Sequence, residues 1–363
     1  MGDPMQDIRL ADILAAGRNV QTVLVDNAAG RMRMVAEHAR HSDAILFSSL
    51  ALYVALTVAR ELNKPAIGLW LQPISPTREF PAPMMPPLKL PGWMNLLTYS
   101  LLRRHLRRWL GKGTDAACEQ AFGHTPSKKT SFDFPLLYGI SPQLVTQPSD
   151  WPRTDQLCGQ WTLPTPNWHP PVALGEFLRA GPPPIYVGFG SGSSFLRKKR
   201  LMPLIAAIAG RRALFYPGWS KIDANVLPNN FFVLGDTPHD WLFPQTAMVI
   251  HHGGAGTTHS AARAGVPQIV LPFGADQHFW AHAAANAGGA PKYFKGTETN
   301  VDRLAAMINY CERKDVRLKA KLLGAAISRE TGIANTVQVL ASLISNQSSY
   351  SGTVDSQVSL KPA

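Results

Sequence analysis

The sequence contains few cysteines and no long hydrophobic run, and both shortages restrict the class of protein. Its three cysteines are Cys118, Cys158 and Cys311. They are far apart and lack the paired spacing of a zinc site, which indicates a reducing compartment and no metal. The longest apolar run, residues 44–59, is too short to cross a bilayer. Because no charged segment, apolar stretch and cleavage site follow Met1, we expect no secretory signal and a cytoplasmic location.

Acidic residues are also scarce relative to basic ones. The chain has 36 Lys and Arg against 24 Asp and Glu, which gives a formal net charge of +12. Such an excess favours an anionic partner: a nucleotide, an acidic lipid surface or a nucleic acid. Nucleic-acid-binding proteins usually show aromatic residues interleaved with basic ones, or a known helical motif, and this sequence shows neither. We therefore expect no nucleic acid partner.

The second half of the chain alternates short apolar runs with helical patterns. The predicted strands are 185–189, 213–216, 231–234, 248–251 and 268–271. The predicted helices are 197–209, 257–264, 277–287, 301–310 and a long tail to about residue 345. This alternation is typical of parallel βαβ units, so it predicts a doubly wound α/β domain over residues 185–345.

The first half is less regular, although it begins in a similar way. Residues 43–62 read as a strand followed by a helix, and residues 66–71 read as a second strand. The proline-rich segment 72–91 cannot form a helix or a central strand, so we expect a surface loop. An amphipathic helix is predicted over 96–110.

The 363 residues and 45% hydrophobic content are enough for two domains. We assign residues 1–162 to an N-terminal domain and residues 163–184 to a proline-rich linker. The serine-rich residues 346–363 are predicted to be disordered.

The most informative segment is the apolar strand 248–251, which runs into Gly253, Gly254 and Gly256 and then into a helix. Unpaired amides at the start of a helix form an anion site, and glycines allow the backbone to approach a diphosphate closely. Taken alone, a pair of glycines fits an ordinary strand-to-helix turn, with Thr257 as the helix cap, equally well or better.

The longer string carries more information. It reads His-His-Gly-Gly-Ala-Gly-Thr-Thr at 251–258, then Arg-Ala-Gly-Val-Pro at 263–267 and Pro-Phe-Gly-Ala-Asp-Gln at 272–277. It resembles the signature of GT-B glycosyltransferases of the sterol, glycopeptide and macrolide type. The likeness covers about 157–345 and is looser over the first domain. It implies two Rossmann-like doubly wound domains with parallel sheets, of which the N-terminal one is incomplete.

The resemblance also implies the roles of individual residues. The donor diphosphate would be held by Gly190, Ser191, His252, Gly253, Gly254, Gly256, Thr257 and Thr258. Asp276 and Gln277 would bind sugar hydroxyls, with an N-cap role for Asp276 as the alternative. Trp241 would lie beside the nucleotide base, although a plain core aromatic is the simpler interpretation of that residue.

The implied reaction moves a hexose from a UDP- or dTDP-sugar to a hydroxyl of a lipophilic acceptor, such as a sterol, lipid or polyketide, with inversion. It needs no cofactor beyond the nucleotide sugar and no metal. The family's general-base histidine has no match in this chain, so we expect either a truncated record or a natural variant. The alternative is therefore a donor-binding pseudoenzyme or partner subunit, and we expect this chain as written to be inactive.

Two further interpretations are weaker. Gly188-Phe-Gly190-Ser-Gly192 departs from a dinucleotide fingerprint because its third glycine has the wrong spacing. A nucleotide-sugar epimerase of the same architecture fits the Gly-Thr-Thr and Asp-Gln pattern less well than a transferase does.

The resemblance also implies that the partial N-terminal domain, residues 1–162, binds the acceptor, and we expect the pocket between the 72–91 loop and the 96–110 helix. One face of that helix carries Arg103, Arg104, Arg107 and Arg108. These arginines suggest peripheral attachment to an anionic membrane surface. The alternative is an ordinary solvated helix face.

Overall fold

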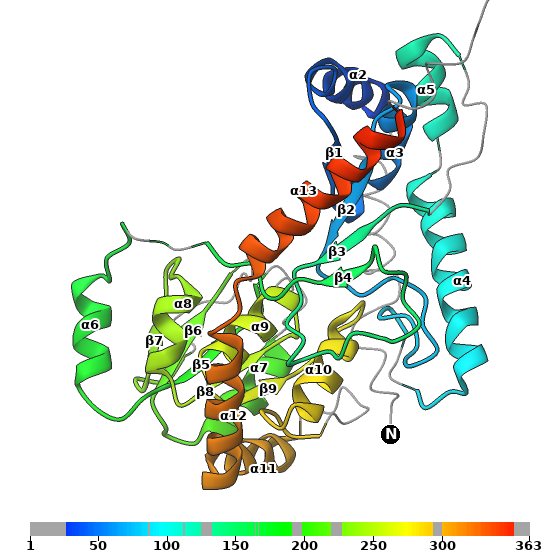
Figure 1. The fold of residues 1–363 in the computed structure, drawn as a ribbon. Coiled ribbons are helices and arrows are strands. Elements are labelled where there is room, and N and C mark those ends of the chain that lie inside the picture. The colour runs from blue at the N-terminus through cyan, green and yellow to red at the C-terminus, as the bar shows by residue number, and fades with distance from the viewer. Residues whose placement is uncertain are drawn as a thin grey trace, which may run out of the picture.

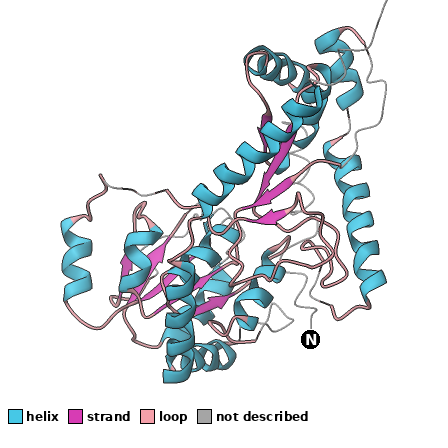
Figure 2. Cartoon of the chain, viewed as in Figure 1, coloured by secondary structure: helices cyan, strands magenta, loops and turns pink. Residues whose placement is uncertain are grey.

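The computed structural model describes residues 27–85, 88–111, 113–124, 133–163, 165, 167–190, 198–218, 227–292 and 300–351. Their strands form two parallel sheets, each in its own domain (Figure 1). Helices cover both sheets, so the architecture is the predicted mixed α/β class (Figure 2). The alternating pattern produces this result because the central strands are apolar and can be covered on both faces: every residue of the strands 136–138, 185–188, 248–251 and 268–270 is buried.

The N-terminal sheet has the order β1-β2-β3-β4. The elements of this domain are α2 (Ala28–Ala39), β1 (Ile45–Phe47), α3 (Leu52–Glu61), β2 (Ala66–Trp70), α4 (Gly92–Leu110), α5 (Thr114–Phe122), β3 (Leu136–Tyr138) and β4 (Gln156–Leu157). The helix predicted over 96–110 begins four residues earlier, after Pro91. The described residues of 72–91 form neither helix nor strand, as predicted.

The C-terminal sheet has the order β7-β6-β5-β8-β9. Its elements are α6 (Val172–Arg179), β5 (Ile185–Gly188), α7 (Lys198–Ile208), β6 (Ala213–Tyr216), β7 (Phe231–Val233), α8 (His239–Leu242), β8 (Met248–His251), α9 (Ala255–Arg263), β9 (Gln268–Val270), α10 (Gln277–Asn286), α11 (Val301–Glu312), α12 (Lys314–Ile327) and α13 (Gly332–Ser351). The order reverses between β5 and β8, and ligands of open α/β sheets bind in the crevice at such a switch point.

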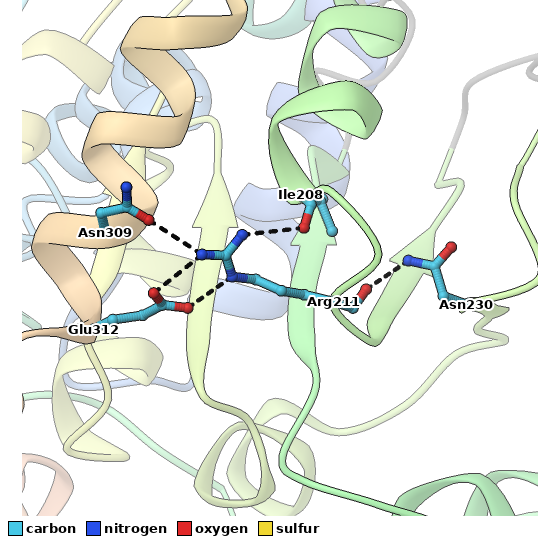
Figure 3. Close-up of polar contacts among 5 residues, drawn as sticks. All are labelled: Ile208, Arg211, Asn230, Asn309 and Glu312. Carbon is cyan, nitrogen blue, oxygen red and sulfur yellow. Dashed lines mark hydrogen bonds and ion pairs between the residues drawn. The ribbon is translucent and has the colours of Figure 1, made fainter.

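The helices around this sheet are fixed by side-chain pairs as well as by apolar contact. Arg211, which follows α7, holds Glu312 of α11 through two hydrogen bonds of 2.7 and 3.1 Å (Figure 3). A third bond of 3.1 Å joins it to Asn309. The planar guanidinium suits this two-point contact with a carboxylate, so it fixes the register of α11 against α7.

The boundaries of the predicted segments differ from the structure in two places. The predicted 163–184 linker contains α6, whose Leu174 is buried against the second sheet's core. The last helix continues to Ser351, past the predicted end at 345, and residues 352–363 lie outside the described residues. Apolar side chains explain the first difference, because α6 has a buried face to pack.

Helix α13 packs against the N-terminal sheet rather than its own domain's sheet. Its Leu340 and Leu343 contact a small core formed by Ile67, Leu137 and Cys158. In Figure 1 the helix, drawn in red, runs from the C-terminal domain up to strands β1 and β2. The chain therefore crosses between the domains a second time, and α13 ties them together.

Polar contacts also join the two domains. Glu330, after α12, accepts hydrogen bonds from Ser141 Oγ at 2.5 Å and from the Gln160 amide at 3.1 Å. His259 of α9 accepts a bond from the Ser141 amide at 3.1 Å. The loop after β3 is thus bound to the helix that follows β8.

Candidate donor-binding site

The turn after β8 requires glycine at its second position, residue 253. Gly253 has φ +93°, and a Cβ there would lie 2.6 Å from Val270 Cγ1 and 3.0 Å from the Gln277 carbonyl oxygen. Any other residue would be strained and would collide with its neighbours. Gly254 then precedes α9 as its N-cap residue. The turn could be predicted from the sequence because only glycine fits sterically at residue 253.

Helix α9 begins with backbone amides that have no partner within the helix, and it begins at the end of strand β8. Its first backbone bond within the helix runs from Thr258 N to Gly254 O at 3.0 Å, so the amides of Ala255, Gly256 and Thr257 precede the helical pattern. Within the described part of the chain, a Cβ built on Gly256 would meet no heavy atom within 4 Å. The helix start therefore has open space in front of it, where the dipole favours an anion.

His252 lies between two of the predicted glycines. A Cβ on Gly190, which has φ +51°, would lie 3.2 Å from His252 Cε1, and a Cβ on Gly254 would lie 2.8 Å from His252 Nε2. The imidazole is 9% exposed, and its Nδ1 has no hydrogen-bond partner among the described residues. Burial lowers the pKa of His252, and the nearby Asp276 opposes this only in part. A neutral imidazole with an unsatisfied nitrogen is thus held at the switch point.

His251 has a supporting role in this turn. It is fully buried; its Nδ1 accepts a bond from the Gly253 amide at 3.1 Å, and its Nε2 donates to Gln268 Oε1 at 2.9 Å. Burial lowers the pKa of His251 to about 3, so the ring stays neutral. Its bonds fix the path of the turn.

A cavity of about 390 Å³ opens beside this helix start. We call it the donor cavity. Gly190 and Thr257 line one part of it, and Trp168, Tyr216, Asp236 and His239 line another. The hydroxyl of Tyr216 donates to Asp236 Oδ1 at 2.8 Å. The cavity therefore joins a phosphate-sized anion site to an aromatic and carboxylate-lined region, which suits a nucleoside diphosphate.

Trp241, predicted to lie beside the nucleotide base, is not among the residues that line the donor cavity. Trp241 packs against Trp168, with ring centroids 4.9 Å apart, and it is Trp168 that lines the cavity. Trp241 thus supports the aromatic wall from behind. The sequence did not suggest Trp168, because it lies in the proline-rich segment 73 residues earlier along the chain.

Asp276 and Gln277 lie at the start of α10, where their side chains are already engaged. Asp276 Oδ2 accepts bonds from Trp280 Nε1 at 2.9 Å and from Gln72 Nε2 of the other domain at 3.0 Å. Gln277 Oε1 accepts from the amides of Phe273 and Gly274. Asp276 is the N-cap residue of α10, as the alternative interpretation placed it, but its carboxylate makes no capping bond to the helix.

Two predicted phosphate ligands stand apart from the rest. Thr258 is fully buried, and its hydroxyl donates to Gly254 O at 2.9 Å, so that donor is already used inside the helix. Ser191 lies outside the described residues. The structure brings together Gly190, His252, Gly253, Gly254, Gly256 and Thr257.

Comparison with known proteins finds a matching family model and relatives along most of the chain. Residues 201–331 match the family model of the erythromycin biosynthesis protein CIII-like C-terminal domain. The chain is 30% identical over 307 residues to an O-mycaminosyltylonolide 6-deoxyallosyltransferase of Streptomyces fradiae, covering 79% of this chain and 70% of that protein. It is 30% identical over 309 residues to a sterol 3-beta-glucosyltransferase of Arabidopsis thaliana, covering 82% of this chain but only 48% of that relative's length.

The fold has close counterparts among solved structures. The crystal structure of the glycotransferase of kitacinnamycin superposes with a TM-score of 0.66 at 16% identity, covering 95% of this chain and 85% of that one. The sequence relatives and the shared fold lead to one assignment: the chain belongs to the GT-B glycosyltransferases of the sterol and macrolide type.

Proposed function

We propose that this chain transfers a hexose from a UDP- or dTDP-sugar to a hydroxyl of a lipophilic acceptor, with inversion. The observation that carries the proposal is the start of α9, where the first amides of the helix and the neutral His252 lie next to Gly190 and Thr257, and these two residues line the donor cavity. The macrolide and sterol transferases among the relatives support the same reaction class. The proposal involves no cofactor besides the nucleotide sugar.

In this proposal the chain's residues act mainly on the leaving group. The acceptor oxygen forms a bond to the anomeric carbon while the bond from that carbon to the diphosphate breaks. The hydroxyl proton passes to a base that the predicted site residues do not include. Amides of Gly256 and Thr257, with the helix dipole, stabilise the negative charge that collects on the departing diphosphate. His252 supplies a further hydrogen bond from a ring that is neutral and buried.

The acceptor would occupy a second pocket, between the domains. This interdomain pocket has a volume of about 540 Å³, and its apolar walls include Phe80, Met85, Leu144 and Phe279. One polar group stands out in it: Asn95 is 2% exposed, and its Oδ1 has no partner among the described residues, while its Nδ2 donates to Arg78 O at 2.8 Å. A hydrocarbon-rich acceptor with a hydroxyl directed at Asn95 would fit this lining.

The predicted position of the acceptor agrees in part with this pocket. The proline-rich loop contributes much of the lining through residues 79–81, 85 and 88–90. Helix α4 contributes Asn95, and α10 contributes Phe279, His282, Ala283 and Asn286. The interdomain pocket lies beside the start of α10, since Phe279 follows Asp276 on that helix.

Calorimetric titration with UDP, dTDP and GDP tests the donor half of the proposal. We expect UDP or dTDP to bind, and substitution of His252 to weaken that binding. A chain that binds none of these nucleotides would overturn the proposal. Turnover of a UDP- or dTDP-sugar with a sterol or macrolide acceptor then distinguishes a transferase from a donor-binding pseudoenzyme, which the relatives do not favour.

We also propose peripheral contact with an anionic surface through the arginines of α4. Arg104, Arg107 and Arg108 are exposed, whereas Arg103 is half-buried, and burial lowers its pKa. Within the part of the chain that the structure describes, no helix is both long and apolar enough to cross a bilayer.

A further inference from the structure

Helix α4 has an apolar stripe on the side opposite its buried face. The buried face consists of Asn95, Thr98, Tyr99, Leu102 and Leu106. On the other side, Trp93 is 64% exposed, Leu97 is 52% exposed and Leu101 is 60% exposed. These three residues are spaced four apart, so they form one line along the helix surface. We call this line the outer stripe.

Basic residues continue the outer stripe toward the C-terminal end of the helix. Arg104 and Arg108 follow Leu101 at helical spacing, and both are exposed. The 19 residues of α4 include four arginines and no acidic residue. In Figure 1 the helix, drawn in cyan, stands at the outer edge of the N-terminal domain, on the side away from α2 and α13.

The proline-rich loop beside α4 adds further apolar surface. The Ala82 amide donates to Thr98 Oγ1 at 2.8 Å, which holds the loop against the helix. Met84 of this loop is 49% exposed and Leu88 is 37% exposed. Leu88 also lines the interdomain pocket. The exposed apolar surface therefore reaches the pocket proposed for the acceptor.

We propose that the outer stripe lies in the interface of an anionic phospholipid bilayer. Trp93, Leu97 and Leu101 would enter the boundary between headgroups and acyl chains, while Arg104 and Arg108 would contact the lipid phosphates. Amphipathic helices with aromatic and leucine residues on one side and arginines beside them bind membranes in this way, and indole rings prefer that depth. The apolar stripe alone would fit several partners; the arginines select an acidic one.

This inference extends the proposed peripheral contact. The arginines attract the protein to the anionic lipids, and three apolar side chains also insert into the bilayer interface. It also rests on the proposed function in one respect: a lipophilic acceptor could pass from the bilayer to the interdomain pocket past Leu88. The docking itself does not depend on transfer. A protein without nucleotide affinity could still bind vesicles through α4, so the two proposals fail separately.

Flotation with lipid vesicles tests the docking. The full chain is mixed with vesicles of phosphatidylcholine and phosphatidylglycerol, or of phosphatidylcholine alone, and the bound fraction is measured. We expect binding to the anionic vesicles. The triple variant W93Q/L97Q/L101Q should bind at least about tenfold more weakly, and R104Q/R108Q about thirtyfold more weakly at low salt, as expected for about 1 kcal/mol per arginine.

A matched control comes from α12, where Leu318 is 57% exposed and Leu322 is 63% exposed, also four residues apart on a basic helix. The variant L318Q/L322Q should bind vesicles like the wild type. Thermal unfolding followed by circular dichroism checks that each variant is folded. The proposal would be overturned if W93Q/L97Q/L101Q bound the vesicles as the wild type does, or if binding were lost only in L318Q/L322Q. It would also be overturned if the wild type did not bind anionic vesicles.

Discussion

His259 and Ser141 connect the two domains through one hydrogen bond, in which the Ser141 amide donates to His259 Nε2 at 3.1 Å. The other ring nitrogen, Nδ1, donates to Ala255 O at 2.8 Å inside α9. The ring therefore has its proton on Nδ1 and is neutral, and it links the helix of the proposed phosphate site directly to the N-terminal domain. Protonation of Nε2 would remove the acceptor on which this link depends.

This relationship predicts acid sensitivity. Burial lowers the pKa of His259 to about 4 from its usual 6.5, so between these values the unfolded chain binds a proton that the folded chain does not. The free energy of unfolding should fall as the pH drops from 6.5 to 4, by up to about 1.4 kcal/mol per pH unit for this residue. Urea unfolding of the wild type and H259Q at pH 7, 6 and 5 measures this.

His259→Gln keeps an acceptor oxygen for Ser141 but does not titrate. Its stability should therefore depend less steeply on pH than that of the wild type below pH 6.5. His251 and His239, whose pKa values burial lowers to about 3 and about 4, remain in the variant and keep some acid sensitivity. Equal slopes for wild type and variant would contradict the assignment of this effect to His259.

Glu330 makes the second polar link between the domains. Its carboxylate accepts from Ser141 Oγ and the Gln160 amide, so Glu330→Ala leaves both donors without their partner. We expect a loss of about 2 kcal/mol in the free energy of unfolding, as for hydrogen bonds to charged groups. Glu37→Ala, at an exposed position of α2, serves as the control and should leave stability unchanged. Equal effects of the two substitutions would argue against the link.

Gly256 offers a test that separates binding from folding. A Cβ at this position meets no heavy atom of the described chain within 4 Å, and alanine is a better helix former than glycine. Gly256→Ala should therefore be at least as stable as the wild type while its methyl group blocks the space in front of the helix. The affinity for UDP or dTDP should fall about tenfold or more, the equivalent of one hydrogen bond to a charged group.

Gly253→Ala is the contrasting substitution. Here the added Cβ would lie 2.6 Å from Val270 Cγ1 in a backbone with φ +93°. This variant should lose stability together with nucleotide binding. Thermal midpoints and calorimetric affinities of both variants distinguish the two glycines, and a Gly256→Ala protein that binds UDP normally would remove that residue from the site.

The C-terminal sheet could be predicted because its signals are local. Each of its strands is a short apolar run. The turn after β8 has no room for a Cβ at Gly253, and the glycine needed there can be read from the sequence. Strands β3 and β4 were not predicted, since they have three and two residues and too little pattern to detect. Helix α5, nine residues long and only weakly amphipathic, was missed for a similar reason.

The parts of the site that could not be predicted depend on contacts between distant segments. Trp168 reaches the donor cavity from the proline-rich segment before β5, and Gln72 reaches Asp276 across the domain boundary. The outer stripe was not predicted, because the helix was expected to begin at residue 96 and so to exclude Trp93. Nothing in the local pattern at Thr258 indicated that its hydroxyl would donate to Gly254 O rather than to a ligand.

The central claim is that the start of α9 and His252 bind a diphosphate. Calorimetric titration of UDP and dTDP into the wild type, His252→Ala and the exposed control His41→Ala tests it most directly. The account predicts binding to the wild type and the control, and affinity lower by about tenfold to a hundredfold in His252→Ala. Binding of neither nucleotide to the folded wild type, or equal affinity in His252→Ala, would contradict it.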